Sequence, residues 1–360
     1  MNNLESVLSL NPFSMGEQEK NDFLTRSLGE LTRLHYKHCA PYSNILDALH
    51  FDLLNINSYY DIPFLPVSLF KELTLKSVPD EDVFKTMTSS GTTGQTVSKI
   101  YLDKTTASNQ QKVLVKIVSS FTESSRMPML IIDSSAVVKN RAMFSARGAG
   151  ILGFSIFGTD RTYALDDEMN INLPVIKAFL EKHEGKKVLL FGFTFMVWQH
   201  FYKEFVRSGD KLDLSNGCLI HGGGWKKLAS EAVSQAEFKD RLKSQFNLSD
   251  IHDYYGMVEQ TGSIYMACEH GHLHASNYSD VIIRRPSDFS VCSPGETGII
   301  QVVSILPQSY PGHSLLTEDE GVLLGIDNCL CGRKGKYFKI NGRLKNAELR
   351  GCSDTYAARN

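Results

Sequence analysis

Apolar and polar positions change their spacing along the chain, from mainly helical periods in the first 85 residues to short strand-like runs further on. A proline-punctuated connector, IPFLPVSLF, covers 62–70. The expected strands are PMLIID (128–133), KVLLFGF (187–193) and CLIHGGGW (218–225), the last entering a glycine turn. The expected helices cover 107–121, 171–183, 195–207 and 226–246. This alternation predicts an α/β fold with a largely parallel sheet.

The pattern changes again from about residue 275. Three short β-rich runs follow one another with turns between them: DVIIRR, GIIQVVSIL and GVLLGI. No long segment of helical period separates them. We therefore expect a smaller β subdomain in the last part of the chain.

Composition and charge narrow the class of protein. The 360 residues are 42% hydrophobic and 22% charged, with a formal net charge of −2. This balance is typical of a globular protein and argues against nucleic acid as the main partner. We expect no secretory signal and no integral membrane association, because the amino end lacks a long apolar run and no stretch approaches 18 apolar residues. Seven scattered cysteines, an odd number, then predict a reduced, cytoplasmic protein.

A loop rich in small and hydroxylic residues, TMTSSGTTGQTVSK, covers 86–99. Its glycines allow backbone N–H groups to turn inward, and its hydroxyls add donors, as a phosphate requires. The loop lacks the G-x-x-x-x-G-K-[ST] spacing of a Walker A motif. Phosphate binding and an ordinary solvated turn are both consistent with this segment.

Two further motifs each have a functional and a structural interpretation. HGGGW at 221–225 is similar to the oxyanion-hole segment of esterases, but the G-x-S-x-G nucleophile elbow that such enzymes need is missing from the sequence. Its glycines suit either a flat ligand lying against the backbone or a tight strand-to-helix turn. DYYGMVEQTG at 253–262 places aromatic side chains beside Glu259, a carboxylate suited to Mg²⁺. Tyrosines in such a segment are also common in a protein core.

Two clusters of soft ligands predict a zinc site. CEHGHLH covers 268–274 and CLC covers 329–331. We expect Cys268, His274, Cys329 and Cys331 to complete a tetrahedral Zn²⁺ site that holds the late β segment to the body of the protein. His270 and His272 are alternative ligands.

A last cysteine, Cys352, lies in a polar tail, ELRGCSDTYAARN, between Gly351 and Ser353. Its flanks do not suggest a buried structural thiol. Nearby cations such as Arg350 would favour the reactive thiolate form. The residues from Arg343 to Cys352 would span at most about 30 Å when extended, which suits a mobile arm.

In sequence order, several of these motifs resemble the core motifs of adenylate-forming enzymes, which include acyl-CoA synthetases and phenylacetate–CoA ligases. The motifs are SSGTTGQ, HGGGWK, YYGMVEQTG, LLTEDEG and the Gly342–Arg343 pair. More narrowly, IPFLPVSLFK, FGFTF, HGGGWKKL, CLCGRKGKYF and ELRGCSD resemble the acyl-protein synthetase family. That family contains the ligase component of the fatty-acid reductase complex of bacterial bioluminescence. The resemblance covers nearly the whole chain.

The resemblance implies an adenylate-forming α/β domain with mixed sheets, a small β subdomain and a strongly shortened carboxy-terminal lid. The implied regions are a helical region at 1–85, the adenylate-forming core at 86–325 and a short segment at 326–360. It also implies formation of an acyl-adenylate from ATP and a fatty acid, followed by transfer of the acyl group to Cys352 and delivery to an acyl reductase partner. A CoA ligase and a non-catalytic nucleotide-binding subunit are the alternatives.

The resemblance also implies the roles of individual residues. Glu259 would contact Mg²⁺, Asp319 the ribose hydroxyls and Arg343 the ribose or phosphate. Tyr255 would lie against the adenine ring. The remaining nucleotide contacts would come from the backbone and hydroxyls of Ser89, Ser90, Gly91, Thr92, Thr93, Gly94, Gly223 and Gly224.

The sequence departs from the family pattern at three places. Val258 stands where a phosphate-contacting threonine is common, and Thr96–Val97 stand where many relatives have Pro-Lys. Only 17 residues follow Arg343, where a lid of about a hundred residues with a catalytic lysine is usual. Another lysine could take the place of the catalytic lysine of the lid. The candidates are Lys99, Lys226, Lys227 and Lys345.

Overall fold

The computed structural model describes residues 3–89, 97–124, 126–139, 146–225 and 231–344. The chain folds into two compact units, each of which is built from segments far apart in the sequence. The first unit comprises Met1–Ser89, Gln95–Phe121 and Gly256–Ala347, and the second is centred on Thr122–Tyr255. Each unit is described separately below, and the predicted division at residues 85 and 325 stays a prediction.

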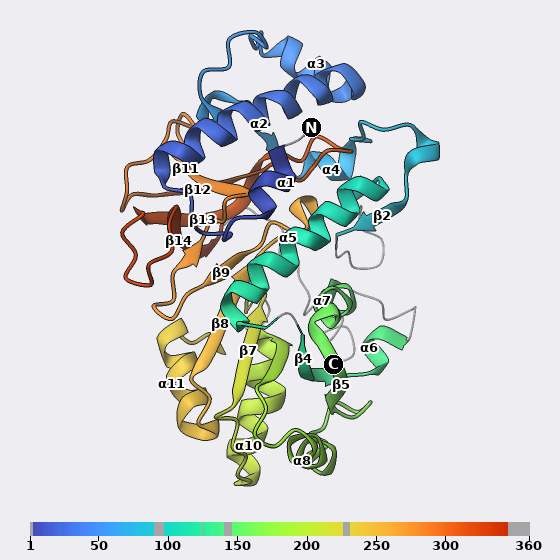
Figure 1. Ribbon diagram of the computed structural model, residues 1–360, viewed down its shortest axis with the longest axis vertical. Helices are drawn as coiled ribbons and strands as arrows, with labels where there is room; N and C mark the ends of the chain where they lie inside the picture. The colour runs from blue at the N-terminus through green and yellow to red at the C-terminus, as the bar shows by residue number, and fades with distance from the viewer. Residues whose placement is uncertain (1–2, 90–96, 125, 140–145, 226–230, 345–360) are drawn as a thin grey trace. The chain divides into compact units, whose positions relative to one another are not determined.

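The first unit combines a mainly antiparallel sheet, a separate two-stranded ribbon and helices that come mostly from the amino end of the chain. Its helices are α1 (Asn3–Leu8), α2 (Glu17–His38), α3 (Ala40–Ala48), α4 (Leu69–Glu72) and α5 (Lys104–Thr122). Its strands are β1 (Leu65–Pro66), β2 (Lys85–Thr88), β3 (Lys99–Leu102), β9 (Tyr265–Ala267), β10 (Leu273–His274), β11 (Ser279–Arg284), β12 (Thr297–Ser304), β13 (Ser314–Ile326) and β14 (Lys336–Arg343). The strand order is β11–β12–β13–β14–β10–β9 (Figure 1). The late β runs predicted from the sequence are thus β11, β12 and the second half of β13.

The second unit is a parallel sheet with order β8–β7–β6–β4–β5. Its strands are β4 (Met127–Ser134), β5 (Gly158–Leu165), β6 (Val188–Phe193), β7 (Gly217–Gly222) and β8 (Asp250–Tyr255). Its helices are α6 (Ala136–Lys139), α7 (Ala146–Phe154), α8 (Leu173–Lys182), α9 (Thr194–Met196), α10 (Lys203–Ser208) and α11 (Gln235–Phe246). A π-helical segment, Val197–Tyr202, joins α9 to α10. The predicted parallel α/β arrangement is therefore confirmed in this unit.

The core of the second unit lies where α8, α10 and α11 pack on one face of the sheet. Aromatic side chains fill it, among them Phe201, Phe205 and Phe246, each no more than 1% exposed. Strand residues such as Leu190 and Leu219 meet them from the sheet. The central strands are mostly apolar because both faces are covered.

Local capping residues set the helix ends. The Ser234 hydroxyl accepts a hydrogen bond from the N–H of Glu237 at 3.1 Å, so α11 begins at Gln235. The predicted start at residue 226 is wrong for the described residues 231–234, because a serine N-cap terminates the preceding loop. Asn247 ends the helix in the left-handed conformation, with φ of 57°.

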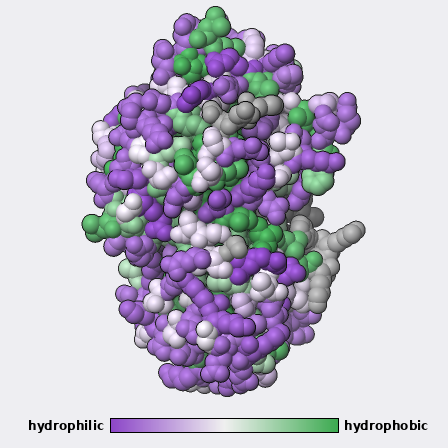
Figure 2. Space-filling model, in the orientation of Figure 1, coloured by the Kyte–Doolittle hydropathy of each residue, from purple (hydrophilic) through white to green (hydrophobic). Residues whose placement is uncertain are grey.

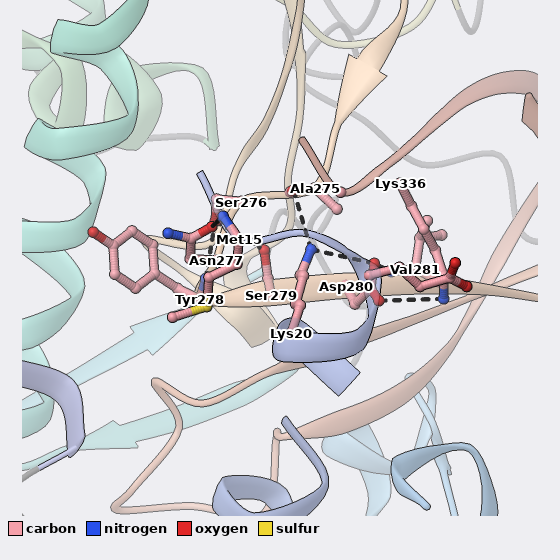
Figure 3. A network of polar contacts seen from close by, with 12 residues as sticks. Met15, Lys20, Ala275, Ser276, Asn277, Tyr278, Ser279, Asp280, Val281 and Lys336 are labelled. Carbon is pink, nitrogen blue, oxygen red and sulfur yellow. Dashed lines mark hydrogen bonds and ion pairs between the residues drawn. The ribbon is translucent and has the colours of Figure 1, made fainter. Parts of the chain in front are cut away.

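A buried network of charges ties the first unit together (Figure 3). Asp280, on β11, accepts ion pairs from Lys20 at 3.5 Å and Lys336 at 3.2 Å, and all three side chains are less than 5% exposed. Tyr59 donates its hydroxyl proton to Asp280 Oδ2 at 2.6 Å and accepts a hydrogen bond from the Lys336 ammonium at 3.0 Å. Helix α2, the Tyr59 turn and strands β11 and β14 therefore share one carboxylate.

Burial would raise the pKa of Asp280, but the ammonium groups of Lys20 and Lys336 outweigh it and lower that pKa. Burial lowers the pKa of Lys20 despite its pairing with the same carboxylate. On the protein surface, by contrast, polar residues predominate and apolar ones occur in small groups on the face shown in Figure 2. Within this network, each buried charge has a partner of opposite sign.

We predict that Asp280→Asn destabilises the protein by about 3–5 kcal/mol, because it leaves two ammonium groups in a dry site without their anion. The free energy of unfolding from urea denaturation measures this loss. Asp240→Asn, an exposed aspartate on α11, is the control and should change stability by less than about 0.5 kcal/mol. Equal effects of the two substitutions would contradict the role of the network.

Candidate functional site

The predicted phosphate loop begins on a two-stranded ribbon of β2 and β3. At its base, the Ser89 N–H donates to the Ser98 carbonyl at 3.1 Å, and Ser89 Oγ accepts from the Ser98 N–H at 2.9 Å. Ser89 therefore closes the ribbon from which the loop leaves. The other predicted phosphate contacts lie outside the described residues: Ser90, Gly91, Thr92, Thr93 and Gly94.

Glu259 lies in a short 3₁₀ turn, Val258–Gln260, and is 6% exposed. Tyr310 donates its hydroxyl to the Glu259 carbonyl at 2.9 Å, and Gln110 donates to the Tyr310 oxygen at 3.3 Å. Burial raises the pKa of Glu259, an effect that the nearby Ser98 hydroxyl opposes. No ion pair to this carboxylate is formed among the described residues. The charge of Lys71 also lowers this pKa, but a buried carboxylate without a directly paired cation is suited to a metal ion.

The backbone around Glu259 is closely packed. Gln260 donates to the Gly312 carbonyl at 2.8 Å and to the Val302 carbonyl at 3.2 Å. A Cβ on Gly312 would overlap the Tyr310 ring and lie 2.9 Å from the Glu259 carbonyl oxygen. Only glycine therefore fits at 312 without moving the turn.

Asp319 and Arg343 are cross-strand partners on β13 and β14. Arg343 Nε lies 3.6 Å from Asp319 Oδ1, and Arg343 Nη2 lies 3.3 Å from Glu318 Oε2. The Asp319 and Arg343 side chains are 18% and 33% exposed, so both keep access to solvent. The structure thus brings together the two residues predicted to contact the ribose and phosphates.

In the second unit, the predicted adenine contacts follow the carboxyl ends of adjacent parallel strands. Strand β7 ends at Gly222, and Gly223 follows with φ of 82°, a conformation that favours glycine. A Cβ on Gly222 would overlap the Tyr254 ring. Gly224 is exposed and Tyr255, the last residue of β8, is half-buried. Ligands of open α/β sheets bind at this end of the strands.

Sequence reasoning missed a polar pair at the same strand ends. His221 and Asp253 are register partners on β7 and β8, with Nδ1 and Oδ1 3.7 Å apart. Thr194 Oγ1 lies 3.0 Å from the same His221 nitrogen, and His221 Nε2 has no hydrogen-bond partner within the described ranges. Burial lowers the pKa of His221 to about 3 and raises that of Asp253, whose side chain is 35% exposed, to about 7. The only hint of this pair in the sequence is the histidine that opens the HGGGW motif at the end of a predicted strand.

The four residues of the predicted zinc cluster come together. One ligand atom from each of Cys268, His274, Cys329 and Cys331 lies within 4.8 Å of all the others. Cys268 Sγ lies 4.0 Å from Cys329 Sγ, and Cys331 Sγ lies 3.3 Å from His274 Nε2. His272, an alternative ligand, places Nδ1 3.3 Å from Cys329 Sγ. A Cys₃His set at such spacing is suited to tetrahedral Zn²⁺.

Cys352, the predicted acyl acceptor, lies outside the described residues. The cysteines that the structure does describe are free thiols, and all but the half-buried Cys331 are buried. Burial raises the pKa of Cys218 and of Cys329. These thiols are therefore poor nucleophiles in the protein without metal.

Comparison with solved structures identifies the fold. The chain is similar to 2-hydroxyisobutyryl-CoA ligase in complex with its acyl-AMP, with a TM-score of 0.70 at 13% identity, over 93% of this chain and 70% of that chain. An open form of that ligase with acyl-AMP and CoA gives a TM-score of 0.69 at 14% identity, over 95% of this chain and 79% of the other. The fold is that of the adenylate-forming ligases.

The family model "Acyl-protein synthetase, LuxE" matches residues 2–359. The chain belongs to this family of acyl-adenylate-forming ligases. A long-chain-fatty-acid–luciferin-component ligase of Aliivibrio fischeri is 23% identical over 358 residues, 96% of this chain and 91% of that protein. One from Vibrio harveyi is also 23% identical, over 95% of this chain and 90% of that protein. None of the described helices has the length and apolar character needed to cross a membrane.

We predict that Gly312→Ala displaces the Tyr310 ring and the Glu259 turn. The expected loss of stability is about 1–3 kcal/mol, since an extra methyl in a tight site forces neighbours to move. ATP–pyrophosphate exchange should fall at least about tenfold, because small displacements in a catalytic site are costly. Gly153→Ala on α7, where an added Cβ meets nothing within 4 Å, is the control. Unchanged exchange in the Gly312 variant would show that this turn is not part of the site.

Proposed function

We propose that the protein activates a long-chain fatty acid with ATP and then holds the acyl group as a thioester on Cys352, for delivery to an acyl reductase partner. The names of its relatives support the fatty-acid substrate, since both are long-chain-fatty-acid–luciferin-component ligases. Free thiols also support the proposed cytoplasmic location.

The observation that carries this proposal is the buried carboxylate of Glu259. It is 6% exposed, its backbone is fixed through Tyr310, and no cation pairs with it among the described residues. A carboxylate in such a place fits Mg²⁺, which prefers oxygen ligands and one or two carboxylates beside the phosphates of its nucleotide. When bound, Mg²⁺ would neutralise charge that develops on the phosphates.

The remaining nucleotide contacts are proposed residue by residue. Asp319 would accept hydrogen bonds from the ribose hydroxyls, and Arg343 would pair with ribose or phosphate oxygens. Tyr255 would lie against the adenine ring, beside the exposed backbone of Gly223 and Gly224. The hydroxyls and N–H groups of the Ser89–Gly94 loop would surround the triphosphate.

The proposed reaction has two steps. A carboxylate oxygen of the fatty acid attacks the α-phosphorus of ATP, and pyrophosphate leaves. The thiolate of Cys352 then attacks the acyl carbon, forming a thioester as AMP leaves with the former carboxylate oxygen. The Cys352 thiol gives up its proton before this second step. Activation is needed because a free carboxylate is a poor acyl donor, whereas AMP is a good leaving group.

We predict that Cys352→Ser abolishes covalent labelling by a radiolabelled fatty acid and ATP, while ATP–pyrophosphate exchange continues. The wild-type label should survive denaturing electrophoresis and be released by hydroxylamine, as expected for a thioester. Cys292→Ser, which removes a buried thiol outside the cluster, should retain labelling.

Two results would contradict this proposal. Formation of acyl-CoA with normal turnover in the Cys352 variant would indicate a CoA ligase. Absence of pyrophosphate exchange with every fatty acid tested would indicate a non-catalytic nucleotide-binding subunit.

We also propose that Cys268, His274, Cys329 and Cys331 bind a structural Zn²⁺. The donor set fits, because three thiols and one imidazole nitrogen lie within 4.8 Å of one another in a largely buried place. Burial raises the pKa of Cys268, and it raises that of Cys329 to about 12. Zn²⁺ would stabilise the thiolates that the protein alone disfavours. The ion would join β9 and β10 to the turn before β14.

We predict that the purified protein contains one tightly bound zinc per chain and that Cys331→Ser removes it. Loss of the ion should lower the free energy of unfolding by at least about 3 kcal/mol, because binding energy at a structural site is folding energy. Atomic emission and urea denaturation measure the two effects. Cys292→Ser is the matched control and should keep its zinc. Zinc-free wild-type protein of undiminished stability would refute the site.

A further inference from the structure

Strands β7 and β8 begin with a second group of metal-ligating side chains, in a different unit from the zinc cluster. Cys218 and Asp250 are register partners on these parallel strands. His252 follows Asp250 by two residues, so its side chain lies on the same face of the sheet. The Cys218 sulfur, an Asp250 oxygen and a His252 nitrogen all lie within 4.8 Å of one another.

The three side chains differ in their access to solvent. Cys218 has no exposed surface and His252 is 7% exposed. The Asp250 side chain is 33% exposed. An ion would therefore enter over the carboxylate and meet the buried thiol and imidazole behind it.

We propose that Cys218, Asp250 and His252 form a second metal site, which takes a borderline or soft divalent cation such as Zn²⁺ or Co²⁺. Sulfur, nitrogen and oxygen donors in this combination are typical of zinc, and a water would complete the coordination on the exposed side. Ligand atoms of a tetrahedral zinc site lie about 3–4 Å apart, given bonds of about 2.0–2.3 Å. The observed group needs to contract only slightly.

Binding would change the protonation of two ligands. The Cys218 thiol releases its proton to solvent, since the thiolate is the ligand. His252 Nε2 now donates its proton to Asp250 Oδ1 at 2.8 Å; on metal binding it releases that proton to solvent and offers its lone pair to the ion, and the neutral ring then carries its proton on Nδ1. Asp250 binds through one oxygen, while the other keeps its contact with Lys187.

The ammonium group of Lys187 competes with a metal ion for the Asp250 carboxylate. Its ammonium lies 3.0 Å from Asp250 Oδ2 and is 38% exposed. It supplies the positive charge that balances Asp250 when no metal is present, and it repels a dication only a few ångströms away. The site should therefore bind more weakly than the four-ligand cluster and exchange its ion readily.

The second site is separate from the residues proposed for catalysis. It lies at the amino ends of β7 and β8, whereas Gly223 and Tyr255 lie at the carboxyl ends. The length of β8 from Asp250 to Tyr255 corresponds to about 17 Å of strand. His252 is three residues, about 10 Å of strand, from Tyr255, and the substitutions at the metal site change no residue that is proposed to contact the nucleotide.

The test is a Co²⁺ titration of the full-length protein with its tightly bound zinc left in place. Wild-type protein should take up an additional equivalent and develop a near-ultraviolet thiolate-to-cobalt charge-transfer band. Cys218→Ser should abolish that band, and His252→Gln should weaken binding at least about tenfold. Lys187→Met should tighten binding about tenfold, because it removes the competing charge and keeps every ligand. Cys39→Ser, a buried thiol of the first unit, is the control and should leave the titration unchanged.

Two outcomes would overturn the proposal. One is a wild-type titration without a further equivalent of cobalt. The other is a further equivalent whose band and affinity are unchanged in both Cys218→Ser and Lys187→Met. Circular dichroism shows whether Cys218→Ser folds. If it does not, the Lys187→Met titration alone tests the proposal, because the Lys187 side chain is partly exposed and its replacement leaves the core intact.

Discussion

The buried carboxylate of Asp280 is the constraint on which the first unit depends. Two ammonium groups and a tyrosine hydroxyl meet on it from α2, from the turn at Tyr59 and from the first residue of β14. Because the site is dry, each of these segments must arrive in one register or leave a charge without a partner. At the far end of the same strand, beyond two shifts in the β13–β14 register, Arg343 lies opposite Asp319. The strand that the ion network holds at Lys336 thus also carries a residue that binds the nucleotide in our proposal.

Close packing supplies the second constraint. Gly312 allows the Tyr310 ring to approach the Glu259 carbonyl, and Gly222 allows the Tyr254 ring to approach β7. Each contact fixes the backbone next to a predicted nucleotide contact without adding a side chain that would fill the space. These glycines act by the absence of a side chain, which leaves room for the tyrosine rings. A larger residue at either position would displace the ring and, with it, the backbone of the neighbouring predicted contact.

The sequence predicted those features that depend on neighbouring residues. The runs at 128–133 and 187–193 were recognised as the strands β4 and β6, since buried parallel strands consist mostly of apolar residues. The edge strand β5 was missed, because GTDRTYAL mixes polar and apolar residues as a partly exposed strand does. The Cys268–Cys331 cluster was found because ligand spacing is a local signal. The Lys20–Asp280 pair was not, because its partners are 260 residues apart and lysine or aspartate alone gives no sign of burial.

The metal-binding and acyl-accepting roles that we propose for the cysteines require different surroundings. Burial raises the pKa of Cys218, Cys268 and Cys329, so these thiols stay protonated and do not compete for an activated acyl group. A bound metal ion would lower the pKa of the same thiols, because coordination stabilises the thiolate that burial disfavours. An acyl acceptor needs the opposite surroundings: water, nearby cations and freedom to reach two sites. In the sequence, Cys352 has polar neighbours and Arg350 two residues away, which is why our proposal assigns it this role.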